Sequence, residues 1–467
     1  MLRRLIDSPR LLLWLGLLVF VYSWLVSLCL QLWVIPHLFS QPGASEGLVV
    51  LDSIGFHRIA RDKAAEIARL GWSAWELRPE WQMPAGLASV FYAAWGSSPS
   101  SMLPFNALVH AASACLVMAI LRNFFSAAPA LLGALVFALN PASLEWVAQI
   151  HRDGVFILGN LLFIFGIMRF FRRFSKTDGR WLRYLPAMAF MPIIGTLLVW
   201  MARPYWVQVM LVTTLLVMAL LVFVVSSRRV AGCKGHMACL AAALISVFAF
   251  QLWLVRFHTP TEVVQLPAPA ATEPAAGQAP DQVSEREPES ASKDQFAWKR
   301  SSWLPRMIEE RFYRIAVARR GAVGQGGNTL VDADWRFDSV DSIIGYIPRA
   351  LQLGLFSPLP GLWGGEGSTP AMTMARKVMG AATLFFYGCM IGIPFGIKRM
   401  WRDLSLWVML GASLIGILVY AITYPNIGTL IRYRYGFYML LIGFGVASWC
   451  DLWLRWRLSA VKNGRGA

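Results

Sequence analysis

The sequence predicts an all-α integral membrane protein, a bundle of about ten transmembrane helices. Three observations support this fold class. Of the 467 residues, 57% are apolar and only 15% are charged, which is unlike a soluble domain of this length. Apolar runs of roughly 20 residues, the length that crosses a bilayer core about 30 Å thick, recur along the chain. Basic residues gather between alternate runs, as they do on the cytoplasmic side of membrane proteins.

Ten apolar runs are long enough to be read as membrane spans. They cover residues 11–35, 105–121, 127–148, 154–171, 184–201, 205–226, 237–256, 374–396, 404–424 and 431–453. The first run is too long for a signal-peptide core and has no small-residue cleavage site after it, so we expect a retained anchor. An even number of spans returns the carboxyl terminus to the side of the amino terminus.

The spans divide the chain into six segments. These are a first transmembrane helix (1–35), a first periplasmic loop (36–104), transmembrane helices 2–7 (105–256), a large periplasmic loop (257–373), transmembrane helices 8–10 (374–453) and a cytoplasmic tail (454–467). Within the large loop, residues 262–297 are rich in Pro, Ala, Glu, Gln and Ser. This composition predicts a flexible insert, because it offers too little apolar surface for a core.

The net charge of +17 follows from membrane topology. With the amino terminus in the cytoplasm, 20 of the 43 Lys and Arg residues and only four of the 26 Asp and Glu residues fall on the cytoplasmic side. The basic residues are spread between spans and form no single patch, so no nucleic-acid partner is expected. We expect a multi-pass protein of a bacterial inner membrane, with both termini cytoplasmic.

The first periplasmic loop predicts two juxtamembrane amphipathic helices. Apolar residues recur at helical spacing over residues 54–70, among charged residues. A Trp-rich turn follows at residues 71–79, and a second short apolar helix is expected near residues 85–95.

Ionisable residues stand at the outer ends of several spans, where polar groups are costly and usually functional. They are Asp52 after the first span, His151, Arg152 and Asp153 between the third and fourth, Arg203 between the fifth and sixth, and Arg432 and Arg434 at the start of the tenth. The threading brings these groups to one membrane face, which is where an active site is expected.

Such a set suits attack by a hydroxyl on a sugar carbon whose leaving group is a lipid-linked phosphate. Asp52, near the apolar boundary, is the candidate general base. Arg203, Arg432 and Arg434 are the candidates for neutralising the departing phosphate. The chain has no Gly-x-x-x-x-Gly-Lys-Ser/Thr loop for a nucleotide, which fits a donor that arrives within the membrane.

The order of these features resembles the GT-C superfamily of polyprenyl-phosphate-sugar glycosyltransferases, in particular the branch of protein O-mannosyltransferases and lipid A aminoarabinose transferases. The resemblance covers the organisation of residues 1–256. It implies a GT-C-like bundle in which Asp52 is the acceptor-activating carboxylate, Asp153 a second catalytic carboxylate, and Glu76 a further loop acid. It also implies donor phosphate at Arg432 and Arg434. Ser53 replaces the acidic neighbour that some family members carry, which leaves the acceptor class open.

The remaining substrate-binding candidates flank these residues in sequence. They are His57 and Arg58 after Asp52, Arg78 after Glu76, and His151 and Arg152 before Asp153. No residue is assigned as a metal ligand, because two carboxylates and a histidine make a thin shell for a hard cation. A divalent cation, Mg²⁺ or Mn²⁺, is left open as a cofactor.

The sequence thus predicts an inverting glycosyltransferase that moves a sugar from a polyprenyl-phosphate donor, such as an undecaprenyl-phosphate sugar, to a glycan, lipid or protein hydroxyl outside the cytoplasm. Two other functions stay open. One is an O-antigen ligase or polymerase with a pyrophosphate-linked donor, and the other is a flippase for lipid-linked sugars. Structural roles also compete: Asp52 and Asp153 could only cap helices, and Arg432 and Arg434 could only anchor to head groups.

Overall fold

The computed structural model describes residues 10–173, 185–226, 234–256, 298–327, 329–366 and 370–463. In these ranges the chain forms helices and no strand, with only two isolated β-bridges, so the all-α prediction is confirmed there. The predicted insert at residues 262–297 lies outside the described residues.

The chain divides into two compact units. The first boundary follows Thr259, and the other three fall within α14, α17 and α18. The first unit is Met1–Thr259, Leu355–Ile417 and Ile431–Ala467, and the second is Pro260–Gly354 and Leu418–Leu430. The helices before the first boundary are α2 (Leu11–Cys29), α3 (Ile35–Leu38), α4 (Leu51–Leu70), α5 (Met83–Trp95), α6 (Leu103–Leu121), α7 (Ala127–Ala138), α8 (Leu144–Val147), α9 (Asp153–Arg173), α10 (Leu185–Ala202), α11 (Val207–Ser226) and α12 (Lys234–Arg256). Those after it are α13 (Arg306–Gly324), α14 (Val340–Phe356), α15 (Pro370–Met390), α16 (Gly392–Met400), α17 (Leu404–Thr423) and α18 (Ile427–Asn463).

Seven described helical segments are long and apolar enough to cross a membrane, or eight if one bent pair is a single span. They make the chain a multi-pass membrane protein. The seven are Leu11–Leu38, Pro99–Leu121, Asp153–Phe171, Pro204–Phe223, Arg376–Met400, Leu404–Thr423 and Ile427–Ala460, and the bent pair is Ala127–Ala138 with Pro141–Val147.

The predicted count of about ten spans is therefore not what the described residues give. Every one of the ten apolar runs coincides with a helix or with the bent pair, but Ala189–Ala202 and Leu240–Arg256 are shorter apolar helices. Both adjoin ranges outside the described residues, which limits the apolar length seen there. The bend of 51° in the third run falls at Asn140 and Pro141, where proline removes a backbone donor and interrupts the helix.

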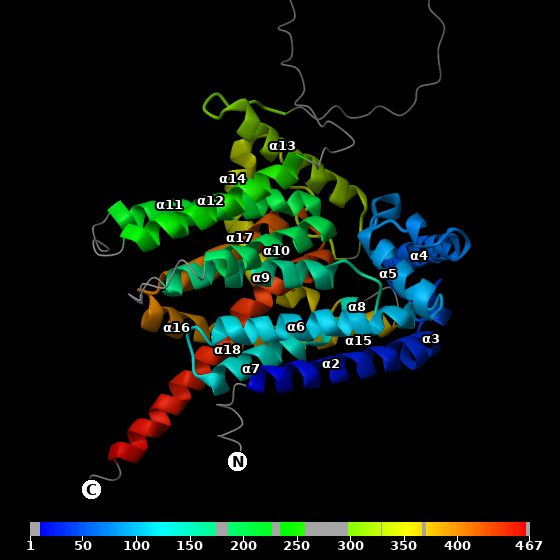
Figure 1. Ribbon diagram of the computed structural model, residues 1–467, viewed down its shortest axis with the longest axis horizontal. Coiled ribbons are helices and arrows are strands. Elements are labelled where there is room, and N and C mark those ends of the chain that lie inside the picture. The colour runs from blue at the N-terminus through cyan, green and yellow to red at the C-terminus, as the bar shows by residue number, and fades with distance from the viewer. Residues whose placement is uncertain are drawn as a thin grey trace, which may run out of the picture. The chain divides into compact units, whose positions relative to one another are not determined.

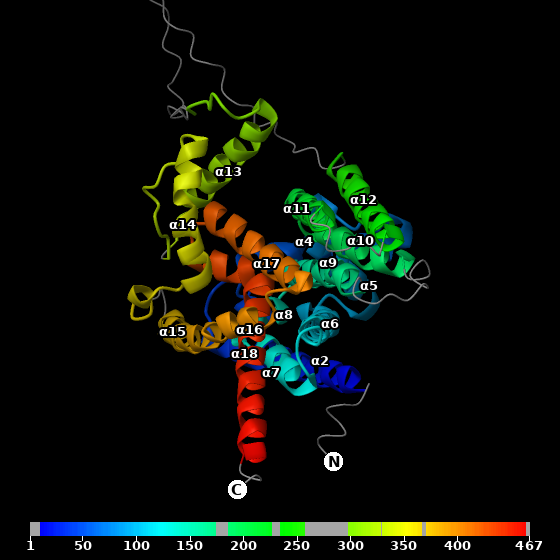
Figure 2. The ribbon, with the colours of Figure 1, turned by 90° about the vertical axis from the view of Figure 1, so that its left-hand side faces the viewer.

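Glycines allow the closest helix crossings of the first unit. A Cβ added to Gly133 of α7 would lie 2.4 Å from the backbone oxygen of Gly443 in α18, and one added to Gly159 of α9 would lie 2.8 Å from the oxygen of Gly195 in α10. Membrane helices associate through such small-residue contacts, because lipid provides no hydrophobic drive between them. Figures 1 and 2 show the resulting neighbours, α9 beside α10 and α2 beside α6.

Two helices occupy the first outer loop, α4 and α5, and they pack side by side at one end of α6 and α9 (Figure 1). Helix α4 buries its apolar stripe, including Phe56, Ala60 and Ala64, against Ala88 and Tyr92 of α5. Gly71 ends α4 with φ of 82°, a conformation that favours glycine. This packing fixes the first turn of α4, which carries Asp52.

The second unit is organised by a buried arginine. Arg319 of α13 donates to the carbonyl oxygens of Ile422 (3.0 Å) and Asp332 (3.0 Å), and its guanidinium lies 4.6 Å from the ring centroid of Tyr346. Asp332 in turn accepts from Arg349 at 2.8 Å and from the Tyr346 hydroxyl at 3.0 Å. These contacts join α13, α14 and the end of α17 within the unit.

Candidate functional site: a carboxylate and arginine cluster

The segment Val147–Ile150 is the scaffold of the site, because side-chain hydrogen bonds fix its backbone. Asn106 of α6 donates to the oxygens of Val147 (3.1 Å) and Gln149 (2.8 Å). Ser53 of α4 donates to the oxygen of Ile150 at 3.0 Å. Gln149 also donates to Gly47 O at 2.9 Å, ahead of α4. The start of α4 is thereby held against the start of α9.

Asp153, the first residue of α9, is the buried centre of the site. Its carboxylate is 2% exposed and pairs with three groups: the Arg203 guanidinium, His151 Nδ1 at 3.0 Å and Arg432 Nε at 3.3 Å. These partners come from the loop before α9, the turn before α11 and the second turn of α18. The carboxylate is enclosed by these partners and holds the two arginines in place. Its catalytic role stays a prediction.

Arg432 also pairs with two further carboxylates, those of Asp52 and Glu145. Its Nη2 lies 3.6 Å from Asp52 Oδ2, and its Nη1 lies 3.6 Å from Glu145 Oε1. The Arg432 side chain is 12% exposed, whereas those of Asp52 and Glu145 are 46% and 42% exposed. The two carboxylates are therefore the accessible groups of the cluster, and the guanidinium lies between them and the buried Asp153.

Arg203 is held between two aromatic rings. Its guanidinium carbon lies 4.6 Å from the ring centroid of Phe156 and 3.9 Å from that of Tyr433. Aromatic faces stabilise a cation that is removed from water. The chain thus places a second fixed positive charge beside Asp153, in line with the positive groups that a departing anion requires.

Four of the residues that were expected on one membrane face are linked by ion pairs: Asp52, Asp153, Arg203 and Arg432. His151 joins them through Asp153, and its ring lies 6.4 Å from that of Phe56. The guanidinium of Arg152 lies 5.8 Å from the ring centroid of the same Phe56. We define Asp52, Glu145, Asp153, Arg203 and Arg432 as the carboxylate–arginine cluster.

His57 belongs to a neighbouring chain of hydrogen bonds. Its Nδ1 lies 2.6 Å from the Tyr92 hydroxyl and its Nε2 lies 3.1 Å from Glu46 Oε2. Burial lowers the pKa of His57, although Glu46 opposes the shift, and burial raises the pKa of Tyr92. His57 consequently links α4 to α5 as a neutral imidazole, and its hydrogen bond and ion pair are made with residues outside the cluster.

Three predicted residues lie outside the cluster: Arg58 of α4, and Glu76 and Arg78 of the Trp-rich turn. Glu76 pairs with Lys63 at 3.5 Å. Arg78 donates to the backbone oxygen of Trp200 at 2.6 Å, with its guanidinium 4.1 Å from the Trp200 ring centroid. Arg58 is exposed on α4. Glu76 and Arg78 therefore brace the loop against α4 and the end of α10.

Arg434 is not brought to the cluster, although it lies two residues after Arg432. Successive residues turn by about 100° in an α-helix, so positions i and i+2 point to nearly opposite faces. Arg434 donates instead to the backbone oxygen of Ser357, and its guanidinium lies 4.3 Å from the ring centroid of Tyr438. Arg432 thus contacts the carboxylates of the cluster, whereas Arg434 contacts Ser357 and Tyr438.

Sequence reasoning missed Glu145 as a site residue. It lies near the end of the third apolar run, 127–148, where nothing in the sequence separates it from an ordinary charge at a span end. The signal was the bend at Asn140 and Pro141, after which α8 turns Glu145 toward α18. Glu46, the partner of His57, was missed because its 3₁₀ turn carries no helical pattern.

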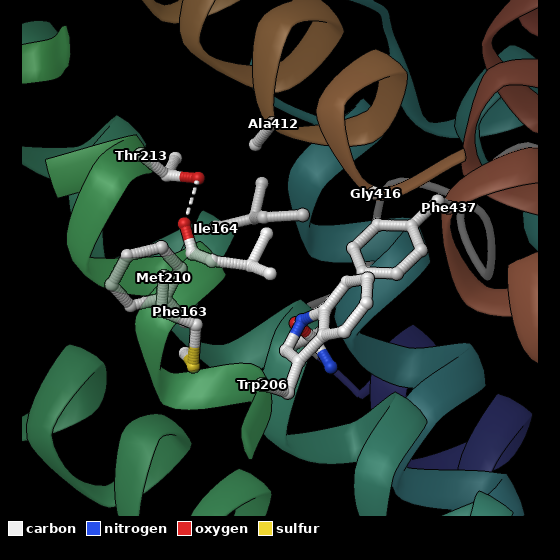
Figure 3. A pocket seen from close by; sticks show the side chains of 10 residues that line it. Phe163, Ile164, Trp206, Met210, Thr213, Ala412, Gly416 and Phe437 are labelled. Atoms are coloured by element: carbon white, nitrogen blue, oxygen red, sulfur yellow. Dashed lines mark hydrogen bonds between the residues drawn. The ribbon is translucent and has the colours of Figure 1, made fainter. Parts of the chain in front are cut away.

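A small apolar pocket lies next to Phe156, whose ring contacts Trp206 and Phe437 of the pocket lining. Trp206, Met210, Thr213 and other side chains of α9, α11, α17 and α18 line it. Figure 3 shows Trp206 and Phe437 along one wall and Gly416 beside them. Phe156 contacts both Trp206, with ring centroids 5.4 Å apart, and Arg203.

Within the described part of the chain, no group of three or more His, Cys, Asp or Glu side chains is arranged to hold a metal ion. The cluster's own charges pair with one another, carboxylate to guanidinium.

Comparisons with known proteins were made for the whole chain. No family model, no curated protein and no solved structure matches it. The site and its chemistry consequently depend on the residues described above.

Proposed function

We propose that this chain is a membrane glycosyltransferase that moves a sugar from a polyprenyl-phosphate donor to an extracytoplasmic hydroxyl with inversion. One observation carries the proposal: Asp52 and Glu145, both half exposed, face the guanidinium of Arg432, which Asp153 anchors from the buried side. An accessible base and a fixed cation on one site are what displacement of a phosphate by a hydroxyl needs.

The proposed step assigns each group a role. Asp52 accepts the proton of the acceptor hydroxyl while its oxygen attacks the anomeric carbon of the sugar. The bond from that carbon to the phosphate oxygen breaks, and the bonding electrons leave with the polyprenyl phosphate. Arg432, supported by Arg203, balances the charge that grows on the departing phosphate.

The apolar pocket next to Phe156 supports a lipid-linked donor. Its lining comes largely from helices that are apolar enough to span a membrane, and Trp206 of that lining contacts Phe156, the ring that lies against Arg203. We further propose that the protein lies in a bacterial inner membrane, that this site faces the periplasm and that both termini lie in the cytoplasm.

The test is turnover by purified protein in lipid nanodiscs. A panel of undecaprenyl-phosphate sugars is supplied with candidate glycan, lipid and peptide acceptors, and released undecaprenyl phosphate is measured by mass spectrometry. We expect release by the native chain, and loss of at least about a hundredfold in Asp52→Asn, the scale of general-base catalysis. Asp62→Asn, an exposed aspartate on the same helix α4, is the matched control and should turn over normally.

The outcomes separate the three functions. Undiminished release by Asp52→Asn would remove the proposed mechanism. Release of a pyrophosphate-bearing lipid from an oligosaccharide donor would instead identify a ligase or polymerase. Movement of the intact donor across the bilayer, without a new glycosidic bond, would identify a flippase.

A further inference from the structure

A second pocket lies on the opposite face of α18 from the carboxylate–arginine cluster. It is bounded by α15, α18 and the turn that begins at Ser357. We define it as the Arg434 pocket, by the one charged side chain among its lining residues. Arg434 itself is 2% exposed.

The polar groups of the Arg434 pocket are suited to an anion. The guanidinium is a fork of five N–H donors, and one of them reaches the backbone oxygen of Ser357. The Ser357 hydroxyl is buried without a hydrogen-bond partner, although a buried hydroxyl normally has one. Ser357 and Arg434 both line the pocket, so the hydroxyl and the guanidinium can donate to one acceptor there.

The rest of the lining is apolar. Met379 and Phe386 of α15 and Ile431 of α18 line the same space. An occupant that fits both parts has a charged acceptor group at one end and an apolar chain at the other. A membrane lipid with a phosphate head group has this chemistry.

The depth of Arg434 agrees with a lipid head group. Arg434 is seven residues into the span that begins at Ile427, which is about 10 Å along a helix at roughly 1.5 Å per residue. The polar head-group layer of a bilayer is several ångströms thick on each side of the core, about 5–7 Å. An arginine about two turns from the end of a span can reach this layer, because its side chain is long.

We propose that the Arg434 pocket binds the phosphate of an anionic bilayer phospholipid, with Arg434 and Ser357 on the phosphate and a chain against Met379 and Phe386. The occupant is distinct from the sugar donor. A donor phosphate at Arg434 would hold its sugar on the face of α18 away from Asp52, because residues 432 and 434 point in nearly opposite directions. The proposal does not depend on the proposed transferase activity.

Native mass spectrometry of the full-length protein in detergent tests this site. The protein is titrated with phosphatidic acid, with diacylglycerol of the same chains and with undecaprenyl phosphate. We expect phosphatidic acid to be retained over diacylglycerol, and its affinity to fall about tenfold in Arg434→Gln, the loss expected for a charge-assisted hydrogen bond.

Two further variants keep the test decisive. Ser357→Ala removes only a hydroxyl that makes no hydrogen bond, so it should fold normally and bind phosphatidic acid about threefold more weakly, as expected when one neutral hydrogen bond is lost. Arg399→Gln removes a guanidinium that already pairs with Asp451, and its retention of phosphatidic acid should be unchanged.

Three outcomes would overturn the proposal. Equal retention of diacylglycerol and phosphatidic acid would show that the phosphate is not recognised. Displacement of the lipid by millimolar inorganic phosphate would show a site for a free anion. Preference for undecaprenyl phosphate, lost in Arg434→Gln, would assign the pocket to the donor. Sugar transfer can persist in each of these cases, so failure of this proposal is distinguishable from failure of the proposed function.

Discussion

Glu145 Oε1 lies 3.6 Å from Arg432 Nη1, on the same guanidinium whose Nη2 faces Asp52. Two accessible carboxylates therefore share one cation at the outer side of the cluster. A phosphate that binds Arg432 bidentately needs the same two nitrogens. The carboxylates and the proposed donor compete for the arginine.

Replacing Glu145 with Gln should tighten binding of the donor phosphate. The change removes one competing negative charge, and an exposed ion pair contributes about 0.2–1 kcal/mol, so the dissociation constant should fall about two- to fivefold. The measurement is a titration with undecaprenyl phosphate followed by native mass spectrometry. Glu76→Gln, which removes a carboxylate paired with Lys63, is the control and should leave the constant unchanged. Weaker binding in Glu145→Gln would instead make Glu145 a direct ligand of the substrate.

Asp153→Asn should destabilise the fold strongly. The carboxylate is buried between Arg203 and Arg432, and removal of one partner from a buried ion pair costs about 3–5 kcal/mol because the remaining charges stay uncompensated. Thermal unfolding in detergent, followed by tryptophan fluorescence, measures the loss. Asp52→Asn, at a half-exposed position, should cost no more than about 1 kcal/mol. Equal midpoints for the two variants would contradict the anchoring role of Asp153.

The His57 contacts predict a loss of stability in weak acid. Burial lowers the pKa of His57 in the folded protein, so near its ordinary pKa of about 6.5 the unfolded chain binds a proton that the folded chain does not. The contribution of neutral His57 to the stability of the fold is therefore complete above about pH 6.5. It is lost as the pH falls from there toward the folded-state pKa of His57.

The variant His57→Gln checks this prediction. Between neutral pH and pH 5, the midpoint temperature of unfolding should fall more steeply for the native protein than for His57→Gln. The other ionisable groups near the imidazole are the same in both proteins. They are Glu46, Tyr92, and Arg61, which pairs with Glu46. Parallel curves for the two proteins would mean that another group causes the pH dependence.

Gly133→Ala should weaken the crossing of α7 and α18. The new Cβ would lie 2.4 Å from the Gly443 oxygen and 2.6 Å from Leu121 Cδ1, so backbone must move. Overpacking of this kind costs about 1–3 kcal/mol. Gly411→Ala is the control, because a Cβ there meets no atom within 4 Å. Its midpoint should stay constant or rise, since alanine is the better helix former. A neutral Gly133→Ala would show that the two helices can separate slightly without loss.

The sequence was sufficient to predict the helical class and the position of each apolar segment. Length and apolarity decide whether a helix is stable in a bilayer, and both are local properties. The two helices of the first outer loop were equally legible, because the stripe with Ile59, Ala60 and Ala64 repeats at helical spacing. The number of spans was harder to predict from the sequence, because a proline bend splits the third run and two runs form short helices.

Threading predicted that Asp52, Asp153, Arg203 and Arg432 share one membrane face, because topology places the ends of these spans there. It did not predict their pairing. Only the tertiary structure shows that Asp153 is enclosed, that Glu145 shares Arg432, and that Arg434 serves another pocket. Threading decides which residues share a membrane face, whereas rotation of each helix about its axis, set by packing such as Gly133 against Gly443, decides which side chains touch.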